Sequence, residues 1–128
     1  LIVFPELCVT GYTCEDLFWQ ELLLEEAKNA LYQVILHTRK KDALVFVGLP
    51  WEKEGKLYNV AAAVSDGQLL GLVPKRYLPN YKEFYELRHF EPGRRTVEWV
   101  DYKGYPVPFG MNQLFVCRDL EGRFGGDL

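Results

Sequence analysis

Short apolar runs separated by turn residues constrain the fold more than any other feature of this sequence. The segment from Asp42 to Pro50 is continuously apolar between Ala43 and Val47, and Leu1 to Phe4 has the same character. Apolar runs without polar alternation are typical of strands that are covered on both faces. We therefore expect a sheet at the centre of the chain, with other layers packed on it.

An amphipathic helix is predicted to pack on this sheet. Between Leu17 and Ile35 apolar residues recur mostly at three- and four-residue steps, with a weaker pattern near Gln20. Thr13 and Asp16 resemble a capping box ahead of it. The basic residues Arg39 to Lys41 follow the helix, where positive charge complements the negative end of the helix dipole.

Further strands are expected downstream of the helix. The pair Asp66-Gly67 is a two-residue hairpin signal, and it lies between two apolar segments, Leu57–Val64 and Gln68–Val73. Beyond them we expect a polar turn at 91–95, short strands at Thr96–Val100 and Leu114–Cys117, and an irregular segment at Pro106–Gly110. A helix combined with buried strands and a hairpin predicts a mixed α/β layer structure.

Charge and hydropathy exclude some classes of function. A chain of 128 residues with a net charge of -3 has room for one domain and has little electrostatic support for nucleic-acid binding. Its densest basic cluster, Arg39 to Lys41, is interpreted as a solvated helix end. No apolar run approaches the roughly 20 residues of a membrane span, and no signal-peptide pattern opens the sequence, so we expect a cytoplasmic location without membrane association.

The cysteines and histidines predict neither disulfides nor a metal site. Cys8, Cys14 and Cys117 are an odd number and include no C-x-x-C pair. His37 and His89 are far apart and have no neighbouring ligand-type residues at metal spacing. We expect reduced thiols and no bound metal.

Two charged residues occupy strand ends beside apolar or aromatic segments. Glu6 follows the first apolar run and precedes Leu7, Cys8 and Val9, and a carboxylate in apolar surroundings is a candidate general base. Lys75 follows a second apolar run and leads into a stretch rich in aromatic rings, which suits one positive charge in a sheltered site. The alternative for both residues is a solvated charge at the end of a strand.

The two segments that contain these residues resemble a known family. FPELCVTGY at 4–12 and VPKRYLPNYKEFYE at 73–86 are similar to motifs of the carbon-nitrogen hydrolase (nitrilase) superfamily, most closely to the glutamine-hydrolysing domains of glutamine-dependent NAD synthetases. The resemblance implies that residues 1–128 form part of an αββα sandwich. It also implies a Glu-Lys-Cys trio, in which Glu6 moves protons and Lys75 stabilises the tetrahedral intermediate.

Further site residues are implied by the same resemblance. Glu86 matches a second carboxylate near the lysine, with Glu83 as a competitor and a solvated loop charge as the alternative. Tyr12, Tyr81 and Phe84 match positions that line a glutamine pocket, although packing of a loop on the core would also explain these rings.

The nucleophile of the trio is expected outside this chain. In the family it lies downstream of the lysine, in a stretch similar to GVEICED, and Arg123 to Leu128 resemble that stretch without its centre. Cys8 and Cys14 fit structural roles better, and the strand-like surroundings of Cys117 do not match the nucleophile motif. We expect a fragment of the family domain, or a sequence with gaps, that alone releases no ammonia from glutamine.

The resemblance also implies partners. Glutamine would be the substrate, and its ammonia would pass to the synthetase domain of the same enzyme, which would use ATP and magnesium to make NAD. Homo-oligomers are expected, because members of the superfamily usually associate. The alternatives are another amidase or carbamoylase of the superfamily, which the aromatic segment at 78–86 disfavours, and a non-catalytic structural or interaction domain.

Overall fold

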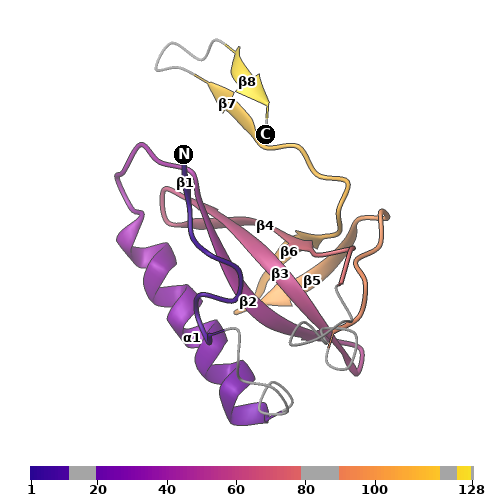
Figure 1. Ribbon diagram of the computed structural model, residues 1–128. Helices are drawn as coiled ribbons and strands as arrows, with labels where there is room; N and C mark the ends of the chain where they lie inside the picture. The colour runs from indigo at the N-terminus through magenta and orange to yellow at the C-terminus, as the bar shows by residue number, and fades with distance from the viewer. Residues whose placement is uncertain (12–19, 79–89, 119–123, 128) are drawn as a thin grey trace.

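The computed structural model describes residues 1–11, 20–78, 90–118 and 124–127, which form one helix and eight strands (Figure 1). In chain order the elements are β1 (Ile2–Val3), α1 (Glu21–His37), β2 (Val45–Lys53), β3 (Lys56–Ser65), β4 (Gln68–Pro74), β5 (Glu98–Tyr102), β6 (Tyr105–Phe109), β7 (Val116–Arg118) and β8 (Phe124–Asp127).

Six of these strands form one mixed sheet in the order β1-β2-β3-β4-β6-β5. The central strands β2, β3 and β4 are antiparallel neighbours, whereas β1 runs parallel to β2 and β6 runs parallel to β4. Strands β7 and β8 pair separately (Figure 1). The mixed α/β structure predicted from the sequence is confirmed.

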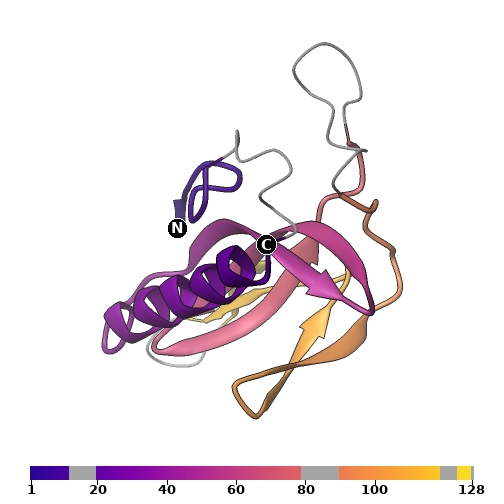
Figure 2. The ribbon, with the colours of Figure 1, turned by 90° about the horizontal axis from the view of Figure 1, so that it is seen from below.

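Helix α1 covers one face of the sheet, as both views show (Figures 1 and 2). It buries Leu24, Ala27, Leu31 and Ile35, which follow the helical period. Alternate residues of the strands complete the main core beneath the helix: Val45, Val47, Leu49 and Trp51 of β2, Tyr58, Val60, Ala62 and Val64 of β3, and Leu72, Tyr102, Val107 and Phe109 of the following strands. No helix in the described part of the chain is long and apolar enough to cross a membrane.

Because side chains alternate along a strand, the remaining residues of β2 and β3 face away from α1. The segment after β6 covers part of this second face. The ring of Phe115 packs edge-on against Phe46 at 5.5 Å, and Gln113 lies over Gly71, where an added Cβ would collide with its side chain. The Gln113 amide donates to the carbonyl of Leu72 at 2.9 Å and to that of Gly110 at 2.7 Å. Glycine at position 71 therefore allows the segment after β6 to lie close to this face of the sheet.

Residue pairs that end in glycine form the tight turns of the sheet. Asp66 and Gly67 have positive φ angles of 43° and 76°, as a two-residue hairpin turn requires, so the predicted hairpin is confirmed. Positive φ angles also occur at Glu54-Gly55 and at Lys103-Gly104, which join β2 to β3 and β5 to β6.

The prediction of an irregular segment at Pro106–Gly110 is wrong, because Tyr105–Phe109 is strand β6. Its prolines pair with Asp101 and Trp99 of β5, and they are two residues apart, so both missing N–H groups lie on the same edge of the strand. The strand expected at Thr96–Val100 runs from Glu98 to Tyr102 instead. That expected at Leu114–Cys117 is shifted to Val116–Arg118. The capping residues Thr13 and Asp16 lie outside the described residues.

Candidate functional site

Lys75 lies immediately beyond β4, and backbone hydrogen bonds hold it on both sides. Its N–H donates to the carbonyl of Asn59 on β3 at 2.8 Å, which continues the ladder past the end of the strand. Its own carbonyl accepts from the N–H of Gly93 at 2.7 Å. A side chain at Gly93 would collide with the backbone of Pro74, so glycine permits this approach. The backbone of Lys75 is therefore fixed between two distant segments.

Glu6 lies in a compact turn that follows β1. The N–H groups of Cys8 and Gly11 donate to the carbonyls of Pro5 and Leu7, at 3.2 and 2.7 Å, and Leu7 is fully buried. The turn rests on Gly48 of β2, where an added Cβ would lie 3.1 Å from the Glu6 carbonyl carbon and would collide with the Leu7 nitrogen. Glycine at this position is what lets the chain that carries Glu6 lie against the sheet.

The two predicted residues meet in space. The ammonium of Lys75 donates to Oε1 of Glu6 at 2.7 Å, and both side chains are only partly exposed, 32% for Lys75 and 39% for Glu6. Within the described part of the chain, both donors to this carboxylate use Oε1, and Oε2 accepts no hydrogen bond. A partly exposed ion pair adds little to stability, so its position is of more interest than its strength.

The pair lies at a hollow of about 320 Å³ on the face of the sheet that α1 does not cover. Strand residues Phe46, Gly48, Ala61 and Val73 contribute to its lining, which is mainly apolar. A lysine and a carboxylate at the rim of an apolar hollow are typical of a small-molecule site, with a few polar groups that fix the orientation of a ligand.

Asn59 completes this polar cluster and was not identified from the sequence. It is only 3% exposed, lies on β3, and donates a hydrogen bond from Nδ2 to Oε1 of Glu6. The one signal for it in the sequence is that it is a polar residue inside the apolar run Leu57–Val64. Buried polar side chains need partners, and Glu6 supplies one here.

The other predicted site residues lie outside the described residues: Glu86 and its competitor Glu83, and the aromatic residues Tyr12, Tyr81 and Phe84. Their predicted roles stay predictions. Cys14 also lies outside the described residues.

The two described cysteines do not line the hollow at Glu6 and Lys75. The thiol of Cys8 lies 3.7 Å from the carbonyl oxygen of Gly48 and borders a different hollow, between β2 and α1. Cys117 is an exposed residue of β7. Among the described residues, no thiol therefore borders the hollow that contains the two charged side chains.

The hollow between β2 and α1 is larger, about 620 Å³, but the described residues that line it include no carboxylate that could act as a base. Its lining is mostly apolar, and the imidazole of His37 is hydrogen-bonded to the Gln33 carbonyl at 2.7 Å. No acid and base face each other across it among the described residues. Size alone therefore does not make it the better candidate.

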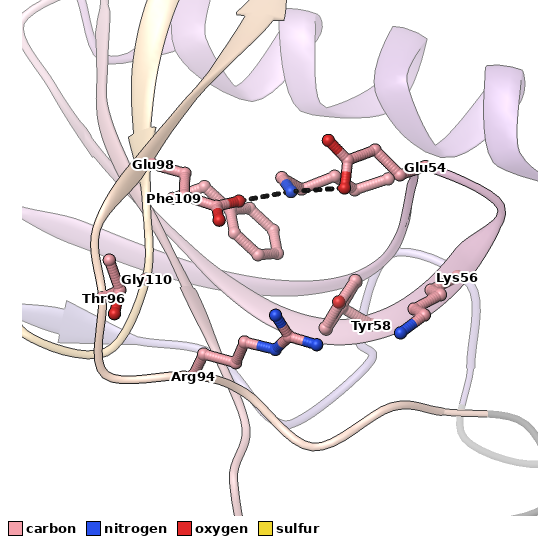
Figure 3. Close-up of a pocket in the computed structure, with 9 residues that line it drawn as sticks. Glu54, Lys56, Tyr58, Arg94, Thr96, Glu98, Phe109 and Gly110 are labelled. Atoms are coloured by element: carbon pink, nitrogen blue, oxygen red, sulfur yellow. Dashed lines mark ion pairs between the residues drawn. The ribbon is translucent and has the colours of Figure 1, made fainter.

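A third pocket lies where the β2–β3 hairpin meets β5 (Figure 3). Lys53 forms ion pairs with Glu98 and, at 3.3 Å, with Glu54. Its hydrogen bond to Glu98 raises the pKa of Lys53, although burial opposes this, and the same bond lowers the pKa of Glu98. These groups stabilise each other's charged forms, and the cluster ties β2 to β5.

No group of three His, Cys, Asp or Glu side chains that could hold a metal ion occurs within residues 1–11, 20–78, 90–118 and 124–127.

Comparison with known proteins gives a consistent result. A family model described as carbon-nitrogen hydrolase matches residues 1–121. The chain is 38% identical over 122 residues to the glutamine-dependent NAD(+) synthetase of Mycobacterium tuberculosis strain H37Rv, covering 95% of this chain and 18% of that protein. It is 40% identical over 120 residues to the enzyme of the same name from Aquifex aeolicus, covering 94% of this chain and 20% of the relative.

Solved structures agree with these sequence matches. The crystal structure of a glutamine-dependent NAD(+) synthetase from Cytophaga hutchinsonii superimposes with a TM-score of 0.81 at 31% identity, over 91% of this chain and 20% of that one. The synthetase of Acinetobacter baumannii, solved with adenosine diphosphate, gives a TM-score of 0.66 at 37% identity, over 84% and 20% of the two chains. The chain thus spans about a fifth of the length of the relatives it matches.

Proposed function

The chain belongs to the carbon-nitrogen hydrolase family, and from this premise we propose that it forms part of a glutamine-hydrolysing site that supplies ammonia for NAD synthesis. The observation that carries the proposal is the contact between Lys75 and Glu6, 2.7 Å apart at the rim of an apolar hollow. The names of the relatives support glutamine as the substrate.

The roles of the two residues follow from the chemistry of amide hydrolysis. Glu6 is the general base: its Oε2 accepts the proton of a cysteine thiol as the sulfur attacks the side-chain amide carbon of glutamine. The ammonium of Lys75 stabilises the negative charge that forms on the amide oxygen. The proton held by Glu6 then passes to the leaving nitrogen, and ammonia departs.

The resulting thioester is hydrolysed by water in a second half-reaction. Glu6 accepts a proton from the water as it attacks, and returns that proton to the departing thiol. One carboxylate thus serves both half-reactions, which requires that it stay within hydrogen-bond distance of both the sulfur and the attacking water.

The proposal assigns the nucleophile to a cysteine outside these 128 residues, because neither Cys8 nor Cys117 lines the hollow with Glu6 and Lys75. The sequence around Cys14, which lies outside the described residues, does not match the nucleophile motif. Glu86 is the proposed second carboxylate near the lysine, and Tyr12, Tyr81 and Phe84 are the proposed lining of the glutamine pocket. ATP and magnesium belong to the proposed synthetase portion, and association into homo-oligomers is part of the same proposal.

The test is the substrate preference of the complete polypeptide translated from the gene. Ammonia release is measured from glutamine, from asparagine and simple aliphatic amides, and from N-carbamoyl amino acids. The proposal predicts turnover of glutamine well above that of the other compounds. Preference for a simple amide or a carbamoyl compound would assign the site to another amidase, and no release from any of them would indicate a non-catalytic domain.

The cysteine assignment is tested in the same assay. Replacing Cys117 by serine in the complete polypeptide is predicted to leave glutamine turnover unchanged. Loss of turnover in that variant would place the nucleophile within this chain.

A further inference from the structure

We propose that Asn59 is a positioning residue for the site, which fixes the carboxylate of Glu6 and the backbone of Lys75 in one geometry. The inference rests on the proposed function, since the reaction it serves is the hydrolysis assigned to these two residues. Neither the sequence motifs nor the comparisons assign any role to Asn59.

Asn59 contacts both charged residues through two different groups. Its side-chain Nδ2 donates to Oε1 of Glu6, and its backbone carbonyl accepts from the N–H of Lys75 at 2.8 Å. Glu6 and Lys75 belong to segments on different sides of β3, one following β1 and the other following β4. One residue, Asn59, therefore makes both the contact that orients the carboxylate of Glu6 and the contact that anchors the backbone of Lys75.

Strand pairing and packing hold the backbone around Asn59 in place. It pairs with Pro50 of β2, and the next residue, Val60, pairs with Pro74 of β4. The flanking side chains of Tyr58 and Val60 are buried in the core under α1. Groups placed on packed strands hold a site more precisely than groups on loops.

The amide is also suited to the carboxylate it meets. With the Asn59 amide and the Lys75 ammonium both on Oε1, rotation of the Glu6 carboxylate is restricted. The other oxygen, Oε2, is then held in one direction for proton transfer. A neutral donor fixes this orientation without adding a second charge beside the lysine.

The experiment is a double-mutant cycle in the complete polypeptide, with ammonia release from glutamine as the signal. Asn59→Leu keeps the approximate shape of the side chain and removes the donor. It is predicted to lower kcat by about 100-fold, as misplacement of a reacting group does, with little change in KM. In the Glu6→Gln background the same substitution is predicted to cause almost no further loss, because the group that it positions is already absent.

Asn59→Asp and Thr38→Val serve as matched variants. Asn59→Asp preserves the shape but places a second carboxylate beside Glu6, so it is predicted to lower kcat at least as much as Asn59→Leu. Thr38 is also buried, and its hydroxyl bonds the backbone of Ile35 and Gly67 away from the hollow. Thr38→Val is predicted to lower the melting temperature and to leave kcat unchanged.

The outcomes separate this proposal from the proposed function. If the parent hydrolyses glutamine and Asn59→Leu does so equally well, Asn59 has no positioning role, although the function stands. Equal losses from Asn59→Leu in both backgrounds would show a purely structural role and would also overturn the inference.

A spectroscopic readout decides the case if glutamine is not hydrolysed at all. In ¹⁵N-labelled protein, the side-chain amide signals of Asn59 are predicted to shift strongly on Glu6→Gln and to stay in place on Glu26→Gln, at an exposed position of α1. Unchanged Asn59 signals in the Glu6→Gln variant would contradict the contact itself.

Discussion

The ammonium of Lys75 lies 2.7 Å from a carboxylate oxygen of Glu6, although the two residues are 69 positions apart in the chain. Neither residue lies within a strand. Each follows the end of one, β1 or β4, and the sheet brings these ends together across β2 and β3. The contact therefore depends on the fold of the whole sheet.

Removing the charge of Lys75 is predicted to slow the reaction more than it weakens glutamine binding. Lys75→Met should lower kcat for ammonia release by about 10²- to 10³-fold, because the charge proposed to stabilise the oxyanion is lost. Lys53→Met, at a lysine in the separate ion-pair cluster, is the control and should retain near-normal kcat. Equal losses in the two variants would indicate a general effect of lysine removal.

Gly48→Ala is predicted to displace the turn that carries Glu6. The new methyl group would collide with the Leu7 nitrogen, and backbone cannot move aside as a flexible side chain can. Glutamine turnover should fall by at least about tenfold, the effect expected of a small shift of Glu6, the proposed base. Gly71→Ala is the control, because its methyl group meets the side chain of Gln113 and no backbone atom of the turn that carries Glu6. A normal rate in Gly48→Ala would show that the turn tolerates the shift.

Tyr102 is predicted to make stability depend on alkaline pH. Burial, with a smaller effect from Tyr32, raises its pKa to about 12 from an ordinary value of 10.0, and its hydroxyl donates to the Lys28 carbonyl at 2.8 Å. The unfolded chain loses this proton more readily than the folded one. The contribution of Tyr102 is thus complete below pH 10 and is lost as the pH rises toward 12.

Tyr102→Phe tests whether Tyr102 makes stability fall as the pH rises. The free energy of unfolding of the parent should fall more steeply between pH 10 and pH 12 than that of the variant, and the tyrosinate absorbance of the folded protein should lose a late-titrating group. Tyr77→Phe, at a residue that is 81% exposed, should behave as the parent does. Parallel curves for the parent and Tyr102→Phe would contradict the assignment.

Leu49→Ala is predicted to destabilise the sheet that holds the site. Leu49 is fully buried under α1, and a leucine-to-alanine change in a packed core costs about 2 to 5 kcal/mol. Leu22→Ala, on the exposed side of the helix, should change the free energy of unfolding by less than about 0.5 kcal/mol. Chemical denaturation of the two variants measures the difference, and equal stabilities would contradict the assigned core.

Local sequence signals predicted much of the fold. Asp66-Gly67 identified the β3–β4 hairpin, because that turn needs residues that accept positive φ. Lys103-Gly104 forms a turn with the same signs of φ, but Pro106 and Pro108 suggested irregular structure. A strand accepts these prolines only where the edge that lacks the N–H groups needs no donor. The neighbouring strands decide whether that holds for β6.

The candidate site was predictable only in part. Glu6 and Lys75 were identified from strand ends and from motif resemblance, but their contact arises from sheet order, which one sequence does not specify. Asn59 was not found, because a single asparagine in an apolar strand looks the same whether it faces solvent or the carboxylate of a distant residue. Its role depends on Gly48, which admits the turn of Glu6 to the same face of the sheet.

The most direct test of the central claim is the rate of ammonia release from glutamine by the complete polypeptide with and without Glu6→Gln. The proposed role of Glu6 as the base in both half-reactions predicts a loss of about 10²- to 10⁴-fold in kcat, with Glu26→Gln indistinguishable from the parent. A Glu6→Gln variant that releases ammonia at the parent rate would contradict the assignment of this site.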